Sequence, residues 1–165
     1  MPRLLVRTVA SASLTLGLLG GASALPAQAA APAAHHTMQM GAQHHTMKLP
    51  SRHKALKAAA SRRGSAYAYG GTGPRRFDCS GLTRWAYARA GKKLPRTSSA
   101  QAGAVRRVSR AAAKPGDLVF FHNGGRVYHV GVYAGRNQLW HASRPGVPVG
   151  KARIWTKSVF FGKVR

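Results

Sequence analysis

The chain contains 165 residues, and 27 lysines and arginines stand against only two acidic residues, Asp78 and Asp117, so its formal net charge is +25. This length accommodates one domain with a real hydrophobic core and excludes a second catalytic domain. A charge of this size indicates anionic partners or, alternatively, a basic face that is only solvated. It carries no information about the fold.

The first 29 residues have the pattern of a secretory signal peptide. Residues 1–7 carry two arginines and no acid, residues 9–25 are apolar or small, and Ala27-Gln28-Ala29 supplies a cleavage signal. A membrane anchor fits less well, because it needs about 20 strongly apolar residues and this run is diluted by Ser, Thr and Gly. We therefore expect a secreted protein that meets anionic polymers of the cell envelope, and we expect no nucleic acid partner.

Residues 30–50 are predicted to be a disordered linker, because they are low in complexity and show no apolar periodicity. A His-His-Thr-Met repeat within them contributes four histidines: His35, His36, His44 and His45. Imidazole and thioether ligands suit copper, and paired histidines bind other late first-row metals. The alternative is a plain linker, since no acidic or cysteine ligand accompanies the repeat. We expect the protein to need no cofactor.

Helices are predicted in the first part of the remaining chain. A basic helix over 51–63, capped by Ser51 and with Leu56, Ala59 and Ala60 on its inner stripe, ends at Gly64. A second helix begins at Cys79, with Asp78 as its N-cap and Gly91 just past its end. A short helix over 98–105 follows. The helix N-terminus favours a charged Cys79 sulfur. Alternatively, Cys79 is a small buried apolar residue.

Strands are predicted in the second part of the chain. A Pro-Gly-Asp turn precedes the first, and Asn123-Gly124-Gly125 is a hairpin signal. The predicted strands cover 118–121, 127–135, 138–143, 153–155 and 159–161. Helices followed by an antiparallel meander favour the α+β class over a doubly wound sheet.

Two histidines on these strands are candidates to act with the cysteine. His129 shares a strand face with Gly131, which leaves space beside the imidazole. If the strands pair around residues 135–137, His141 lies on the same face. A nucleophile, a base and a group that orients the base need to meet only in space. The alternative is a pair of structural histidines. Asp117 is a rival third group, although its place after Pro-Gly favours a turn role.

Five blocks, in order, resemble the NlpC family of cell-wall cysteine endopeptidases. They are Tyr67–Pro74, Phe77–Leu82, Leu94–Ser98, Pro115–Phe121 and His129–Gly135. The resemblance runs from about Ser51 to the C-terminus, so we predict an NlpC-like peptidase domain over 51–165. It implies a papain-like α+β core in which a helix presents the cysteine to a small antiparallel sheet. It also implies hydrolysis of peptidoglycan stem peptides, typically at the bond following D-glutamate.

The resemblance also implies roles for individual residues. Cys79 is then the nucleophile, His129 the general base and acid, and His141 the group that orients His129. Tyr67 is expected to assist the oxyanion or line the pocket, with Asp78 and Ser80 as further substrate or oxyanion candidates. We expect a secreted, cell-wall-associated monomer. Two alternatives stay open: a non-catalytic cationic wall-binding protein, and an amidase or acyltransferase with the same three residues. His122 is expected to be exposed and His53 solvated.

Overall fold

The computed structural model describes residues 49–165. The predicted signal peptide (1–29), most of the predicted linker (30–50) and the four histidines of its repeat lie outside the described residues. Those assignments stay predictions. Within residues 49–165, no helix has the length and apolar character needed to cross a membrane.

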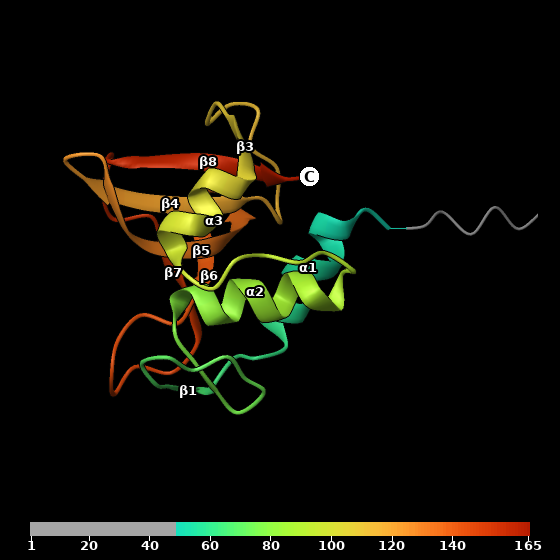
Figure 1. Ribbon diagram of the computed structural model, residues 1–165, viewed down its shortest axis with the longest axis vertical. Coiled ribbons are helices and arrows are strands. Elements are labelled where there is room, and N and C mark those ends of the chain that lie inside the picture. The colour runs from blue at the N-terminus through green and yellow to red at the C-terminus, as the bar shows by residue number, and fades with distance from the viewer. Residues whose placement is uncertain (1–48) are drawn as a thin grey trace, which may run out of the picture. The chain divides into compact units, whose positions relative to one another are not determined.

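Three helices precede most of the sheet (Figure 1): α1 (Ser51–Ala60), α2 (Cys79–Arg89) and α3 (Ser98–Ala104). Helix α1 ends at Ala60, and turns carry the chain on to Gly64, so its predicted end was wrong. Its N-cap is Pro50, without a side-chain cap bond, and not Ser51. It buries Ala55 and Ala59, because these residues face the sheet side of the helix; the inner stripe was therefore only partly correct.

Helix α2 begins where the sequence predicts. Asp78 has an extended backbone, and its Oδ1 accepts a hydrogen bond of 2.7 Å from the Gly81 N–H, as an N-cap does. At the other end Ala90 is the C-cap, and Gly91 follows with φ of 75°, a conformation that glycine adopts without steric cost. The cap therefore places Cys79 at the first residue of the helix.

A six-stranded antiparallel sheet forms the other layer, in the order β3-β8-β4-β5-β6-β7. Its strands are β3 (Val105–Val108), β4 (Leu118–Asn123), β5 (Arg126–Gly135), β6 (Gln138–His141), β7 (Gly150–Arg153) and β8 (Val159–Val164). A separate parallel pair joins β1 (Ala66–Tyr67) to β2 (Arg76–Phe77).

The predicted simple meander needs correction. Strand β8 inserts between β3 and β4, because Phe160 and Phe161 pack on the strands at the centre of the sheet, and β3 was not predicted. The strand predicted over 153–155 lies earlier, as β7, so Trp155 falls in the connection to β8.

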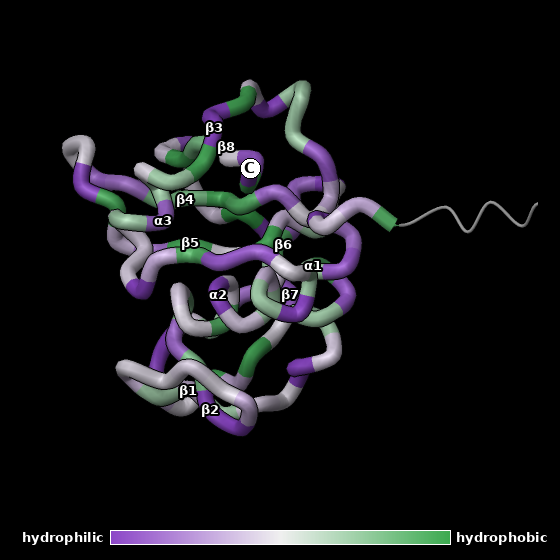
Figure 2. The backbone as a smooth tube through the Cα atoms, turned by 45° about the vertical axis from the view of Figure 1, so that its right-hand side comes forward, coloured by the Kyte–Doolittle hydropathy of each residue, from purple (hydrophilic) through white to green (hydrophobic). Residues whose placement is uncertain are grey.

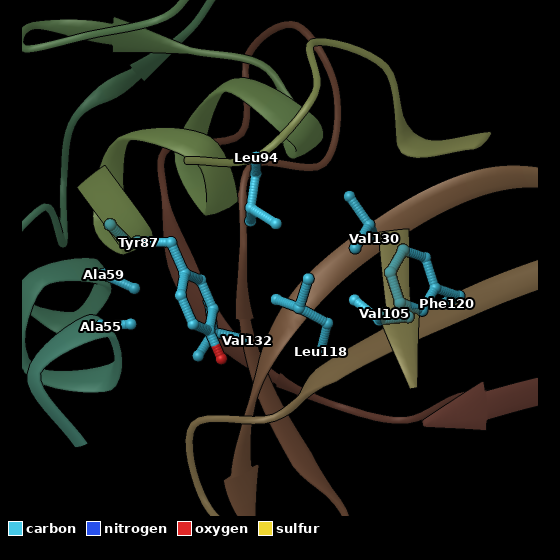
Figure 3. Packing of buried hydrophobic residues seen from close by; sticks show 10 residues of the cluster. Ala55, Ala59, Tyr87, Leu94, Val105, Leu118, Phe120, Val130 and Val132 are labelled. Atoms are coloured by element: carbon cyan, nitrogen blue, oxygen red, sulfur yellow. The ribbon is translucent and has the colours of Figure 1, made fainter. Parts of the chain in front are cut away.

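The main core lies between the helices and one face of the sheet. Tyr87 of α2 lies beside the α1 alanines and close to Leu118 and Val132 (Figure 3). Hydrophobic residues run along β4, near the centre of the sheet (Figure 2), and all of its first four residues are buried. Val119 and Phe121 point to the opposite face, where a second cluster packs against Leu139 and Phe161. Helix α2 is thus held firmly on the sheet, as an α+β papain-like fold requires.

Two features of the sheet position the site. Arg136 and Asn137 both have positive φ (49° and 59°), as in a tight hairpin turn between β5 and β6. Between β4 and β5, Phe121 pairs with His129 but His122 pairs with Val127. Tyr128 is therefore the extra residue of a β-bulge, a feature that redirects side chains beside many active sites.

Candidate active site

Cys79 lines a cleft of about 420 Å³. Helix α2 and the segments around it supply one side, and β5 supplies the other. The residues predicted from sequence that line this cleft are Tyr67, Asp78, Cys79, Ser80 and His129. Arg96, Tyr69, Tyr128 and Ser143 complete much of the wall. Residues up to 76 positions apart therefore share one space, since the fold brings α2 against β5.

Burial raises the pKa of the Cys79 thiol, and the Asp78 charge adds to this. Backbone hydrogen bonds involving Val130, Ser80 and Cys79 itself act in the opposite direction, but they do not outweigh burial. The helix N-terminus therefore does not by itself give the thiolate expected from sequence. Cys79 carries its proton in the free protein, and a base is needed to remove it.

His129 and His141 form a hydrogen-bonded pair on adjacent strands. Their Nε2 and Nδ1 atoms lie 3.0 Å apart, and the ring planes meet at 83°. Both rings are buried. Because Nε2 of His129 is hydrogen-bonded to His141, the Nδ1 atom of His129 remains to accept a proton from the cleft. The predicted pairing of β5 with β6, and the shared face of the two imidazoles, are both present.

Both imidazoles are neutral at pH 7, because burial holds the pKa of each below 6.5. Burial lowers the pKa of His129 to about 3, and the nearby His141 contributes to the shift. Burial also lowers the pKa of His141. A neutral imidazole is the form that can accept a thiol proton, so the pair meets the first requirement of a general base.

Aromatic side chains cover the histidine pair. The Trp155 ring stacks on Phe121, with centroids 4.0 Å apart and planes within 14°. Its centroid lies 5.6 Å from that of His129 and 5.5 Å from that of His141. Sequence reasoning placed Trp155 in a strand and assigned it no role at the site. Only its packing over the two imidazoles shows that it helps to exclude water from them.

Asp78 is the centre of a hydrogen-bonded cluster with Arg96 and Ser80, which we call the Arg96 clamp. Gly70 and Gly81 donate backbone hydrogen bonds to its carboxylate (2.9 and 2.7 Å), and Arg96 forms an ion pair with it. Burial alone would raise the pKa of Asp78, but the hydrogen bonds from Arg96, Gly81 and Ser80 and the Arg96 charge together lower it. These contacts fix Asp78 and Arg96 beside the cleft, and the predicted substrate or oxyanion roles of Asp78 and Ser80 stay predictions.

Arg96, like Trp155, is a site residue that the sequence did not reveal. Its Nη1 donates to Ser80 Oγ at 2.9 Å, and its guanidinium borders the cleft. Two features of the sequence pointed to an arginine at the site. Arg96 lies in the Leu94–Ser98 block, and Asp78, one of only two acidic residues, precedes the cysteine and needs a basic partner. Those features could not show which of the many arginines pairs with Asp78.

Tyr67 borders the cleft from β1. Burial raises the pKa of its hydroxyl, and the neighbouring Cys79 and Asp78 raise it further. The hydroxyl therefore keeps its proton and can donate a hydrogen bond, as an oxyanion contact requires.

The other candidates lie away from the cleft. Asp117 is buried in the turn just before β4, where its Oδ2 accepts a hydrogen bond of 2.9 Å from the Lys114 N–H, in keeping with a turn role. His122 is half-buried and not exposed as expected, because it packs near Phe160. His53 is exposed on α1. Within residues 49–165, no three His, Cys, Asp or Glu side chains gather as metal ligands.

Comparisons with known proteins identify the family of the chain. The model of the NlpC/P60 family matches residues 64–163. The chain is 51% identical over 89 residues to a probable endopeptidase p60 of Listeria monocytogenes, covering 54% of this chain and 18% of that protein. It is 39% identical over 114 residues to the bifunctional muramidase/DL-endopeptidase CwlT of Bacillus subtilis, covering 65% of this chain and 35% of that protein.

A solved structure shows the same fold. The P60 domain of a Mycobacterium avium subspecies paratuberculosis antigen superposes with a TM-score of 0.63 at 30% identity, covering 69% of this chain and 94% of that one. The chain spans less than a fifth of the Listeria protein and about a third of CwlT, so the likeness concerns only part of each of those relatives.

Proposed function

The chain belongs to the NlpC/P60 family, and on this premise we propose that it is a secreted cysteine endopeptidase that hydrolyses stem-peptide amide bonds of peptidoglycan. The observation that carries the proposal is the shared cleft of Cys79 and His129, with His141 hydrogen-bonded to the far nitrogen of His129. Relatives named as endopeptidases support the same chemistry.

The first half of the reaction forms a thioester. As Cys79 Sγ attacks the carbonyl carbon, its proton passes to His129, since neither group is charged beforehand. The negative charge that develops on the carbonyl oxygen is stabilised by the Cys79 backbone N–H and the Tyr67 hydroxyl. Collapse of this intermediate breaks the C–N bond, and His129 returns its proton to the leaving amine.

The second half releases the acid. His129 takes a proton from water, the hydroxide attacks the thioester, and the proton returns to the departing Cys79 sulfur. His141 forms no bond to substrate. Its hydrogen bond to His129 Nε2 selects the tautomer and orientation of the base, so its replacement costs less activity than loss of either reacting group.

The Arg96 clamp is suited to the acyl half of the substrate. Its guanidinium is held by Asp78 and Ser80 at the helix side of the cleft. A fixed guanidinium binds carboxylates well. This supports a bond following D-glutamate as the site of cleavage, with the free carboxylate of that residue directed to Arg96.

Surface charge supports wall association. In the described chain the only acidic side chains, Asp78 and Asp117, are both buried, so the surface over residues 49–165 offers basic side chains without exposed acidic partners. Such a surface is attracted to anionic envelope polymers, less strongly as ionic strength rises. We place the enzyme, as a monomer, outside the cell at its wall.

Purified muropeptides of known structure test the proposal. Wild type is expected to release new amine termini, detected by mass spectrometry, whereas Cys79→Ala and His129→Ala release none. Cleavage that survives Cys79→Ala would end the proposal. The position of the new carboxyl terminus distinguishes an endopeptidase from an amidase, whereas an acyltransferase gives a new amide in place of that terminus.

The cationic surface also supports a second function, wall binding without catalysis. It would be favoured by equal sedimentation of wild type and Cys79→Ala with purified walls, accompanied by no amine release from either protein.

A further inference from the structure

The proposed reaction determines which half of the substrate lies on which side of the cleft. The leaving amine must reach His129 to receive its proton, so the half of the substrate that departs lies on the β5 side. The acyl half then lies along the Arg96 clamp. On the β5 side the wall of the cleft is formed by Tyr128 and His129, together with Ser143 beyond β6.

The bulge in β5 connects this side to a second hollow. Tyr128, the extra residue of the bulge, is 51% exposed and borders both the catalytic cleft and a neighbouring hollow of about 510 Å³. The neighbouring hollow is formed by the β4–β5 hairpin and the β7–β8 connection. Its lining is polar apart from Tyr128: His122, Asn123, Arg126, Thr156 and Ser158.

This second hollow is cationic and contains no acid. Arg126 is exposed, and its guanidinium makes no hydrogen bond or ion pair with any side chain or backbone group of residues 49–165. Asp78 and Asp117, the two acids in that range, are buried elsewhere. A free guanidinium among hydroxyl and amide donors is a setting that selects an anion, and carboxylate is the anion that a peptide carries.

We propose that the second hollow is the subsite for the departing half of the substrate, and that Arg126 binds a free carboxylate on it. The ligand is a peptide with a carboxylate within the first residues after the cleaved bond. Tyr128 separates the catalytic cleft from the second hollow. An extended peptide advances about 3.5 Å per residue, so about two residues after the cleaved bond are enough to pass this side chain. The assignment rests on the proposed hydrolysis, because that reaction defines which half departs.

Two synthetic stem peptides test the subsite. They share the acyl half and differ only in the departing half, which ends as a free acid in one and as a carboxamide in the other. Wild type is expected to favour the acid by about tenfold in kcat/KM, as a charge-assisted hydrogen bond contributes. Arg126→Gln reduces this ratio to about two or less, and added salt weakens it in wild type.

Arg63→Gln is the matched control. It removes the same charge from an exposed turn after α1 that lines neither hollow, and so keeps the wild-type ratio if the effect is local. Equal kcat/KM for acid and amide in wild type, or an unchanged ratio in Arg126→Gln, overturns the subsite while hydrolysis stands.

Binding separates the subsite from the reaction. The departing peptide alone, as acid or amide, is titrated into Cys79→Ala by calorimetry, with Arg126 present or replaced. If the acid binds more tightly than the amide, and this difference disappears in Arg126→Gln, the subsite is supported. If wild type nevertheless cleaves no peptide, the proposed function is wrong although the subsite is correct. Equal binding of acid and amide overturns the subsite.

Discussion

Buried His129 should make the protein less stable as the pH falls from 7 to 5. His129 is only 7% exposed, and burial lowers its pKa to about 3 from an ordinary value of 6.5. Between these two values the unfolded chain binds a proton at this residue and the folded protein does not. The free energy of unfolding therefore decreases as pH decreases through this window.

The size of the effect follows from linkage. One pKa unit corresponds to about 1.4 kcal/mol, so through His129 alone the step from pH 7 to pH 5 removes about 2 kcal/mol. The loss is complete only below the folded pKa, where it reaches about 5 kcal/mol. His141, whose pKa burial also lowers, adds to the loss in the same direction. Asp78 does not contribute in this window. Its folded pKa is lowered from 3.8, so the stability it provides is lost only at more acidic pH.

Urea denaturation at pH 7 and pH 5, followed by tryptophan fluorescence, measures this effect. The comparison is with His129→Gln, which keeps a polar group facing His141 but has no titrating imidazole. Wild type is expected to lose about 2 kcal/mol more than the variant between the two pH values. Equal losses, or an NMR titration of the His129 ring with a midpoint near 6.5, would refute the conclusion that burial keeps the base neutral.

Three further substitutions test the packing around the site. Gly131→Ala would place a Cβ 2.8 Å from the Trp140 carbonyl oxygen. We expect urea denaturation to show about 1–3 kcal/mol of destabilisation, together with a lower kcat. An unchanged free energy of unfolding and kcat would contradict the close approach of β6. Trp155→Ala exposes the paired imidazoles, and the acid limb of kcat/KM should move to higher pH, with a smaller shift for Trp155→Phe. Arg96→Gln removes the guanidinium from the Arg96 clamp and should lower kcat/KM about tenfold through KM, whereas an effect on kcat alone would argue against substrate binding there.

Local signals predicted the helix that carries the cysteine and the hairpin that carries the histidines. An Asp before an apolar period and a Gly after it are short-range determinants, and both ends of α2 follow them. The turn at residues 136 and 137 is also a short-range determinant, because it sets the register of β5 against β6. With that register known, the alternation of side chains along the strands places His129 and His141 on one face.

Predictions failed where long-range packing decides the structure. Strand β8 lies between β3 and β4 although its sequence resembles that of any short apolar strand, so its neighbours could not be inferred from it. The bulge at Tyr128 depends on the register between two strands. Trp155 joins the site only because the β7–β8 connection folds over Phe121.

By itself, the sequence predicted the candidate nucleophile and its candidate partners, and it determined the nucleophile's helix and the family, because these depend on residue types and short spacings. Only the tertiary structure decided the protonation states and the shape of the site. Burial keeps Cys79 protonated and His129 neutral, and the meeting of α2 with β5 selects Arg96 for the cleft. These properties depend on the atoms that surround a group, and those atoms come from distant parts of the chain.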